Sequence, residues 1–181
     1  MGWRKILKRE HEAVLEVLDA AEREARRMEE TGEARLDVLH DLLEFFRHFN
    51  DGIHDPKEEE LLFARCVKRG MGEDVGQFGR LMKDHDETRG RVNELRDSYR
   101  SLRDGKGETP AGLARLLHEY DELIRAHIEI EDNEFFDLAQ GYLTIEDRRE
   151  LSEEFDSAHE DETEEGVFEY FEELGHRVSQ S

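Results

Sequence analysis

The sequence has little that would cross-link it covalently or place it in a membrane. Its 181 residues include one cysteine, Cys66, and two prolines. A lone cysteine forms no internal disulfide and has no partner for a Cys-x-x-Cys zinc or redox motif. We therefore interpret Cys66 as a small buried hydrophobic residue in a reducing compartment. The chain also lacks an uncharged apolar run of about eighteen residues, the length that indicates a transmembrane helix.

Basic residues are few compared with acidic ones. The chain has 26 Lys and Arg against 48 Asp and Glu, which gives a formal net charge of -22. Such a surface repels nucleic acid and anionic lipid, so we expect neither as a partner. It also attracts cations, although a solvated acidic surface is the simpler interpretation. The first ten residues alternate charged and apolar side chains, unlike a secretory signal, and we expect a cytoplasmic protein.

Apolar residues recur every three or four positions through most of the chain, which predicts an all-α fold. Glycine-containing loops separate the helical segments. Four antiparallel helices joined by short loops form an up-and-down bundle. We predict a bundle domain over residues 1–141 and an additional acidic helix over 142–181, packed on the bundle or extending from it. The five expected helical segments are residues 3–30, 34–68, 78–102, 109–141 and 144–174.

Histidine and glutamate interrupt the apolar stripes of the four bundle helices. Burying these groups costs free energy unless they find partners, and an uncompensated buried carboxylate costs several kcal/mol. No Lys or Arg recurs on the stripes beside both glutamates. A bound metal ion would compensate for the cost of burying them. The six candidate metal ligands are His11, His54, Glu58, His85, His127 and Glu131.

These six residues form a repeated pattern of one His followed by His-x-x-x-Glu. His54 follows His11 by 43 residues, and His127 follows His85 by 42. Residues four apart share a helix face, so each His and Glu converge on one point. Two such pairs facing each other would hold two metals, each with two imidazoles and with both glutamates as bridges. Imidazole and carboxylate suit iron, zinc, copper or nickel, so the ligand types do not select among them.

Four segments carry a family resemblance: Glu10-His11 and residues 49–59, 81–89 and 120–136. Together they resemble the hemerythrin-like family, also called HHE cation-binding domains, over about residues 6 to 140. The resemblance implies an up-and-down four-helix bundle around a non-haem centre of two iron ions, bridged by oxo or hydroxo. It implies that the six candidate ligands hold these irons.

The sequence also departs from the family pattern. Many relatives have two adjacent histidines where this chain has His54-Asp55, and oxygen-carrying members have a fifth histidine where it has Leu81 or Arg89. A less saturated metal favours turnover of a small oxidant over oxygen carriage. Pro56 removes a helical amide and predicts a kink between His54 and Glu58.

Several assignments remain open at this stage. Glu59 competes with Glu58 as a ligand, and Asp132 competes with Glu131. Tyr120 lies on the stripe of His127, where it either packs or donates a hydrogen bond near the metals. His159 on the acidic helix is a further candidate ligand.

The leading functional hypothesis is a di-iron protein that binds or turns over hydrogen peroxide, dioxygen or nitric oxide, with peroxide decomposition preferred. One alternative is a non-catalytic module that senses or stores oxygen or iron. Another is a structural bundle without metal. Whether the protein is an enzyme, and its oligomeric state, stay open.

Overall fold

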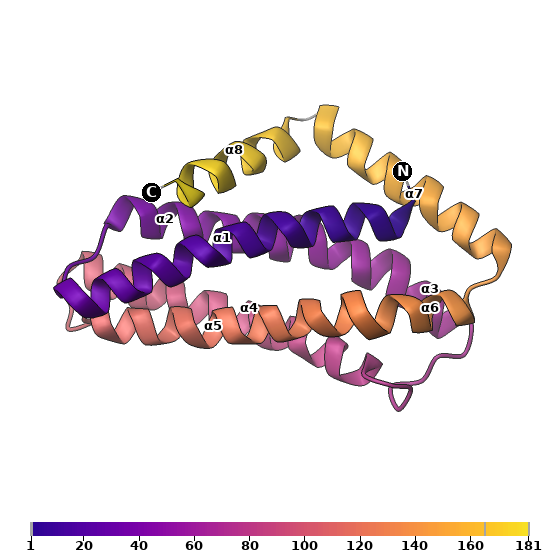
Figure 1. The fold of residues 1–181 in the computed structure, drawn as a ribbon, viewed down its shortest axis with the longest axis horizontal. Coiled ribbons are helices and arrows are strands. Elements are labelled where there is room, and N and C mark those ends of the chain that lie inside the picture. The colour runs from indigo at the N-terminus through magenta and orange to yellow at the C-terminus, as the bar shows by residue number, and fades with distance from the viewer. Residues whose placement is uncertain (1, 165, 181) are drawn as a thin grey trace.

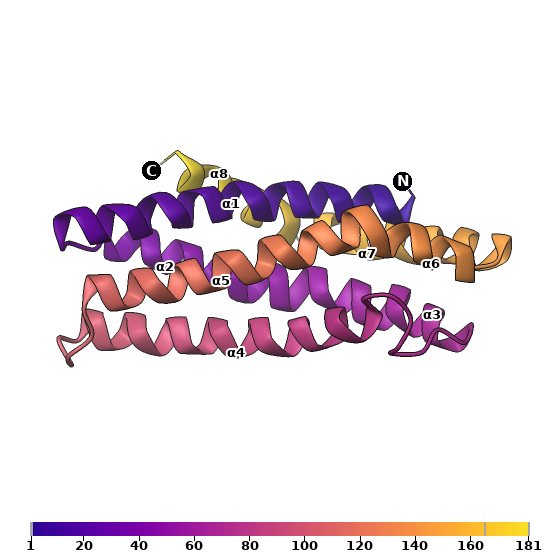
Figure 2. The ribbon, with the colours of Figure 1, turned by 60° about the horizontal axis from the view of Figure 1, so that its bottom comes forward.

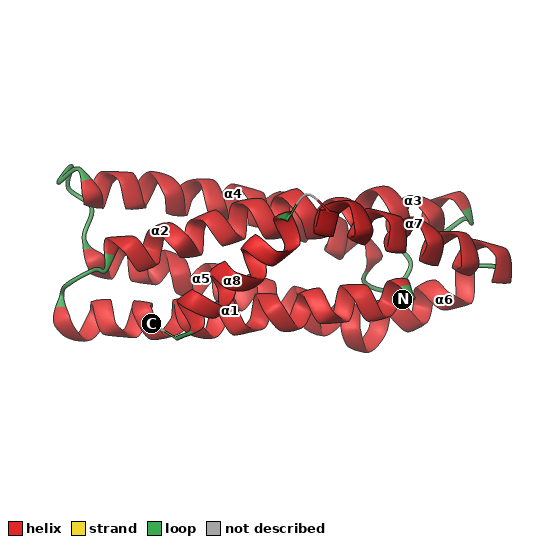
Figure 3. Ribbon diagram, turned by 90° about the horizontal axis from the view of Figure 1, so that it is seen from above, coloured by secondary structure: helices red, strands yellow, loops and turns green. Residues whose placement is uncertain are grey.

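The computed structural model describes residues 2–164 and 166–180, and these residues form helices and loops without a strand (Figure 3). The all-α prediction is confirmed. The first helix, α1, runs from Trp3 to Thr31. It ends where Gly32 adopts φ 70°, because a left-handed residue terminates the helical hydrogen bonds and glycine adopts that conformation at low cost.

The second helical rod changes its winding along its length. It begins as α2 (Leu36–Phe45), continues as two π-helical segments, η1 (Phe46–His54) and η2 (Lys57–Phe63), and ends as α3 (Ala64–Lys68). The third rod is the regular helix α4 (Phe78–Arg103).

The fourth rod comprises α5 (Pro110–Ile130), the π-helical segment η3 (Glu131–Phe135) and α6 (Phe136–Tyr142). Thr109 caps its start by accepting a hydrogen bond from the Gly112 amide at 3.1 Å, with Pro110 in the first helical turn.

The acidic C-terminal segment forms two helices instead of the expected single one. These are α7 (Ile145–Glu164) and α8 (Val167–Ser179), and Gly166 between them has φ 69°. Thr144 Oγ1 accepts from the Asp147 amide at 3.1 Å and Asp147 accepts from the Thr144 amide at 2.9 Å, a reciprocal capping box at the start of α7. The side chain of Phe168, an apolar residue of this segment, lies outside the described part.

The two C-terminal helices lean against the bundle in opposite directions, as Figure 1 shows. Arg65 and Arg69 fasten α7 to the second rod through ion pairs with Asp147, Glu150 and Glu154. The α8 helix contacts α1 and α2 through the buried side chains of Phe171, Leu174 and Val178. Within the described ranges, no helix is long and apolar enough to cross a bilayer.

The buried apolar side chains form two clusters along the length of the rods. One contains Val14, Leu43, Val92 and Leu117, and the other contains Leu7, Leu62, Leu81 and Phe135. In sequence, the candidate ligands on each rod lie between a residue of the first cluster and a residue of the second. Figure 2 shows α1, α4 and α5 running alongside one another through this region. The candidate ligands therefore form a polar layer within an apolar core.

Candidate metal centre

The structure brings all six candidate ligands into one buried cluster. His11 lies on α1, His85 on α4, and His127 at the end of α5. His54 ends η1, whereas the glutamates lie at the starts of η2 and η3. Their exposed fractions are 5% or less, and those of Glu58 and Glu131 are zero. Burial this complete requires compensation for the charged groups.

The backbone around Pro56 widens instead of breaking. Pro56 lies between η1 and η2, and the Asp55 amide that precedes it donates to the Asn50 carbonyl, five residues back. π-Helical turns make such i→i−5 bonds and are frequent at functional sites. The expected effect of Pro56 on the second helix therefore takes the form of wider turns, and these turns carry His54 and Glu58.

The imidazoles meet in two pairs through their Nε2 atoms. In the first pair, His11 Nε2 lies 3.2 Å from His54 Nε2. In the second pair, His85 Nε2 lies 3.1 Å from His127 Nε2. The two pairs come from different halves of the sequence pattern, since His11 and His54 belong to the first His and His-x-x-x-Glu unit and the others to the second.

Both glutamates lie close to both pairs. Glu58 Oε2 lies 3.6 Å from His54 Nε2 and 3.4 Å from His85 Nε2. Glu131 Oε2 lies 3.3 Å from the Nε2 atoms of His11 and His127. The result is two four-residue groups of potential ligands that share both carboxylates, one around each pair. A carboxylate placed between two pairs is suited to bridge two cations.

The inward carboxylate oxygens of the cluster are not satisfied by hydrogen bonds. All four carboxylate oxygens of Glu58 and Glu131 are buried and lack a hydrogen-bond partner in the described part of the chain. We assign the ring protons of His11, His54 and His85 to Nδ1, because each Nδ1 lies within 3.2 Å of a carboxylate. In the neutral form that binds a metal, their Nε2 atoms carry lone pairs, and two such lone pairs about 3 Å apart repel unless a cation holds them. The residues present therefore fit bound metal ions.

A carboxylate faces the outer nitrogen of each histidine. The Nδ1 atom of His54 lies 2.9 Å from Glu10, and that of His85 lies 2.8 Å from Glu59. Such contacts fix the ring orientation and raise the basicity of a ligating imidazole. The other two contacts, at 3.2 and 3.6 Å, join His11 to Asp132 and His127 to Asp84.

The sequence contains a signal for these outer carboxylates that the sequence analysis missed. An acid precedes each single histidine (Glu10-His11 and Asp84-His85), and an acid follows each inner glutamate (Glu58-Glu59 and Glu131-Asp132). In each half, the acid before the single histidine contacts the second histidine of the same half. The acid after the inner glutamate contacts the single histidine of the other half. Glu59 and Asp132, which the sequence left as alternative ligands, therefore lie outside the ring of Nε2 atoms.

The carboxylates control the protonation of the cluster. Burial lowers the pKa of His127, but Glu131, Asp84 and Glu58 together outweigh this effect and raise the pKa to about 10. Burial likewise lowers the pKa of His85, and its contact with Glu58 raises the pKa to about 9. Burial raises the pKa of Glu58, yet His54 and its neighbours hold that pKa well below its usual value. The inner carboxylates are therefore anionic, the form that binds a cation.

Tyr120 and His159 lie apart from the ligand groups. The Tyr120 hydroxyl is fully buried and accepts a hydrogen bond from Asn50 Nδ2 at 2.9 Å, and its ring packs on Phe46. Burial raises the pKa of Tyr120 well above its usual value, so the hydroxyl keeps its proton. His159 lies on α7 and belongs to none of the potential metal-binding groups of the described residues.

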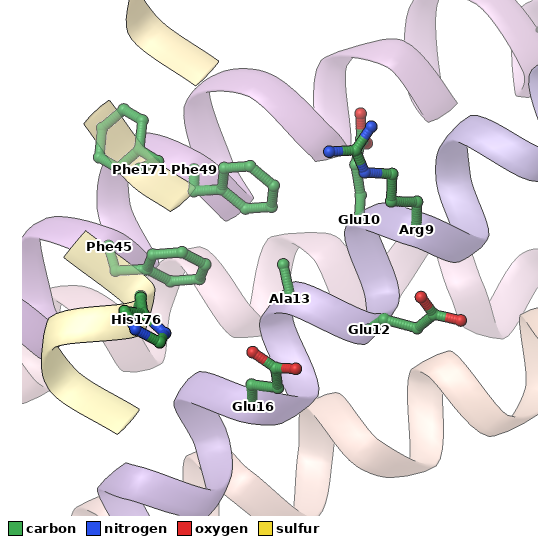
Figure 4. Close-up of a pocket in the computed structure, with 10 residues that line it drawn as sticks. Arg9, Glu10, Glu12, Ala13, Glu16, Phe45, Phe49, Phe171 and His176 are labelled. Atoms are coloured by element: carbon green, nitrogen blue, oxygen red, sulfur yellow. The ribbon is translucent and has the colours of Figure 1, made fainter. Parts of the chain in front are cut away.

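Two hollows adjoin the cluster. A small one of about 10 Å³ is lined by His54, His85 and His127 together with Asn50 and apolar side chains such as Ile124. A larger one of about 340 Å³ lies between α1, the second rod and α8. Figure 4 shows Glu10 on one side of this larger hollow and the rings of Phe45, Phe49 and Phe171 on the other.

Comparison with known protein families supports a cation-binding site at these residues. A family model described as Hemerythrin HHE cation binding domain matches residues 4–139, which include all six candidate ligands. Searches of the curated proteins and of the solved structures found no match. Domains of the matched family bind metal cations, and the buried His and Glu side chains fit such a site. The chain therefore belongs to the hemerythrin HHE cation-binding family.

Proposed function

We propose that the six inward residues hold two iron ions and that the protein binds or turns over a small oxidant there. The observation that carries the proposal is the pairing of four Nε2 atoms around four carboxylate oxygens without hydrogen-bond partners in the described residues. His11 and His54 would hold one ion, His85 and His127 the other, and Glu58 and Glu131 would reach both. Iron bound there would supply redox and Lewis-acid chemistry toward the oxidant.

The size of the adjoining hollow supports a small oxidant. About 10 Å³ is roughly the space that one water molecule needs. Hydrogen peroxide, dioxygen and nitric oxide are close to this size, whereas an organic substrate would require the helices to move. The apolar side chains of Val14, Ile124 and Ile128 line the same hollow and limit the entry of water. Decomposition of hydrogen peroxide to water and oxygen is the preferred activity.

Asp55, Thr88 and Asn50 are polar residues of this hollow, and Asn50 is the uncharged amide among them that could orient an oxidant. Its Oδ1 atom is buried and has no hydrogen-bond partner within the described residues, whereas its Nδ2 atom donates to Tyr120. Tyr120 does not line the hollow and contacts Asn50 from behind. We therefore assign Tyr120 as a positioning residue that fixes the direction of the Asn50 amide.

We further propose that the four rods form an up-and-down bundle over residues 1–141 and that 142–181 are an addition to it. The contacts of α1 with α5, of α4 with α5, and of α1 and α4 with α2 support this topology. The family match ends at residue 139, close to the proposed boundary.

Metal content and oxygen release test the function together. Elemental analysis of the purified protein should find about two irons per chain, and His54→Ala should lower this number. His40→Ala is the matched control, because His40 is a half-exposed histidine of α2 outside the cluster. Wild type and His40→Ala should release oxygen from hydrogen peroxide, and His54→Ala should not. Iron-free protein would contradict the proposal.

The same experiment separates catalysis from binding. Protein with two irons that releases no oxygen from peroxide would contradict peroxide decomposition. It would support the second hypothesis, a module that binds oxygen or iron without turnover.

A further inference from the structure

A third hollow lies away from the metal centre, at the start of α1. It has a volume of about 710 Å³ and is bounded by the first turns of α1, by Gln140 near the end of α6, and by Arg148 and Ser152 of α7. A Cβ atom added to Gly2 would lie 3.9 Å from Ser152 Oγ, which shows how closely α7 approaches this end of α1. The volume falls within the range of small-molecule sites.

Basic side chains dominate the lining of this hollow. Five basic residues contribute to it, namely Arg4, Lys5, Lys8, Arg9 and Arg148. Glu12 is the single acidic residue among the lining residues. This local excess of positive charge contrasts with the formal charge of -22 on the whole chain. Like charges gathered on one surface repel each other, and a bound anion would remove that repulsion.

Existing contacts hold part of this basic cluster in place without neutralising all of it. Arg4 pairs with Asp137, and Lys8 Nζ lies 3.6 Å from Asp132 Oδ1. Arg148 donates to the Gln140 carbonyl at 3.1 Å, an interaction that leaves its charge unbalanced. Lys5 is exposed and makes no hydrogen bond or ion pair with the described residues. These side chains are therefore partly oriented and still attract an anion.

The position of these charges on α1 adds to the attraction. The first turn of this 29-residue helix contains no acidic residue, and Gly2 provides no side-chain cap. The amino end of a helix carries partial positive charge and is normally complemented by an acid. In this chain the basic side chains and the helix end reinforce each other.

We propose that this hollow binds a small organic phosphate. Lysine and arginine are the side chains that bind phosphate, and arginine adds paired hydrogen bonds. The hollow exceeds the size of a free phosphate ion and has room for an attached organic group. Nucleic acid and anionic membranes fit less well, because the acidic surface beyond the hollow would repel them. Gln140, Arg148 and Ser152 lie beyond the family match, so the site depends on the C-terminal addition of this chain.

Trp3 provides a local probe for binding. It is the only tryptophan of the chain and lines the hollow. We would titrate the iron-loaded protein with glycerol 3-phosphate at constant ionic strength and follow Trp3 fluorescence, with glycerol as the uncharged control and inorganic phosphate as a separate arm. We expect a saturable change with glycerol 3-phosphate and none with glycerol. Tighter binding of glycerol 3-phosphate than of inorganic phosphate would support recognition of the organic group.

Two variants and a control locate the site. Lys5→Gln should weaken binding several-fold, and Lys5→Gln combined with Arg148→Gln should weaken it about tenfold or more. Lys106→Gln is the matched control, since Lys106 is an exposed lysine in the loop between α4 and α5, at the other end of the bundle from the start of α1, and it should bind like wild type (Figure 2). Lys8 is left unchanged because its partner Asp132 contacts His11.

Three results would overturn the proposal. The first is the absence of a saturable fluorescence change in wild type. The second is equal affinity in wild type and Lys5→Gln, which would show that the phosphate binds elsewhere. The third is retention of the protein on anionic vesicles or nucleic acid without binding of the small phosphates. The single Lys5→Gln change removes no contact of the described residues, so its thermal unfolding should match that of wild type and keep the comparison valid.

Discussion

The two histidine pairs share their inner glutamates but differ in the charges that support them. Behind the first pair, Glu10 is 2% exposed and contacts Lys57, which is also buried. Behind the second pair, the side chain of Glu59 is 38% exposed and contacts Arg89. Buried ion pairs are costly to break, whereas exposed pairs contribute little. Of these two supporting contacts, the one behind His54 is therefore the more rigid.

The hollow next to the centre follows the same asymmetry. Both histidines of the second pair line it, but only His54 of the first pair does. The pair with both histidines at this hollow is therefore the one that includes the half-exposed contact of Glu59 with Arg89.

Removal of an inner glutamate should have the largest effect, because it acts on both pairs. Glu131→Gln should reduce the iron content from about two per chain to well below one, since its oxygen lies close to one histidine of each pair. Glu129→Gln, on the exposed face of the same rod, serves as the control. Loss of a single iron with the other retained would contradict the shared role of the carboxylate.

Glu10→Ala should be the most destabilising change among the outer carboxylates. It breaks the buried contacts with Lys57 and His54, and breaking a buried ion pair costs about 3–5 kcal/mol. Denaturant unfolding of Glu10→Ala should show this loss, and Glu12→Ala on the exposed face of α1 should be close to neutral. Adding Lys57→Met to Glu10→Ala should restore part of the stability, and a further loss in the double variant would argue against a buried pair.

Asp51 should make the protein less stable as the pH rises toward neutrality. Burial, together with repulsion from Asp55, raises the pKa of Asp51 to about 7 from its usual 3.8. The folded state then holds a proton that the unfolded state releases between these two values. This contribution is complete below about pH 4 and is lost as the pH rises through about 7.

Asp51→Asn should remove that pH dependence. We expect unfolding free energies of wild type to fall by on the order of 1–2 kcal/mol more than those of the variant between about pH 4 and about pH 8, after allowance for solvent screening. The exposed Asp74→Asn should behave like wild type. Parallel pH profiles for wild type and Asp51→Asn would show that Asp51 is ionised throughout.

Glu59→Ala should have the smallest effect on stability. The half-exposed contact of Glu59 with Arg89 is worth less than about 1 kcal/mol. Its contact with His85 should still matter for metal, because loss of such an outer carboxylate lowers metal affinity about 10–100-fold. A stability loss as large as that of Glu10→Ala would remove the contrast between the two pairs.

The helices and the inner residues were predictable because both follow from the helical period. His127 and Glu131 are four residues apart, and this spacing alone places them on one face. The break at Gly166 was missed because the acidic residues before it and the apolar residues after it continue a helical pattern, and the left-handed conformation of one glycine leaves no trace in that pattern.

The π-helical turns and the outer carboxylates were harder to predict for a different reason. A π-turn such as the one ending at His54 forms when an amide donates to the carbonyl five residues back instead of four. Packing against the other rods decides between these two hydrogen bonds. The contacts of Glu10 with His54 and of Asp132 with His11 join residues 44 and 121 positions apart. The helical period carries no information about contacts between residues so far apart in the sequence. The acids repeated next to the ligands were the one available signal for them.

X-ray diffraction from crystals of the iron-loaded protein, collected at the iron absorption edge, tests the central claim most directly. We predict two anomalous peaks, one in contact with the Nε2 atoms of His11 and His54 and the other with those of His85 and His127, with Glu58 and Glu131 between them. A single peak, a peak away from these nitrogens, or histidine pairs without a metal would contradict the account.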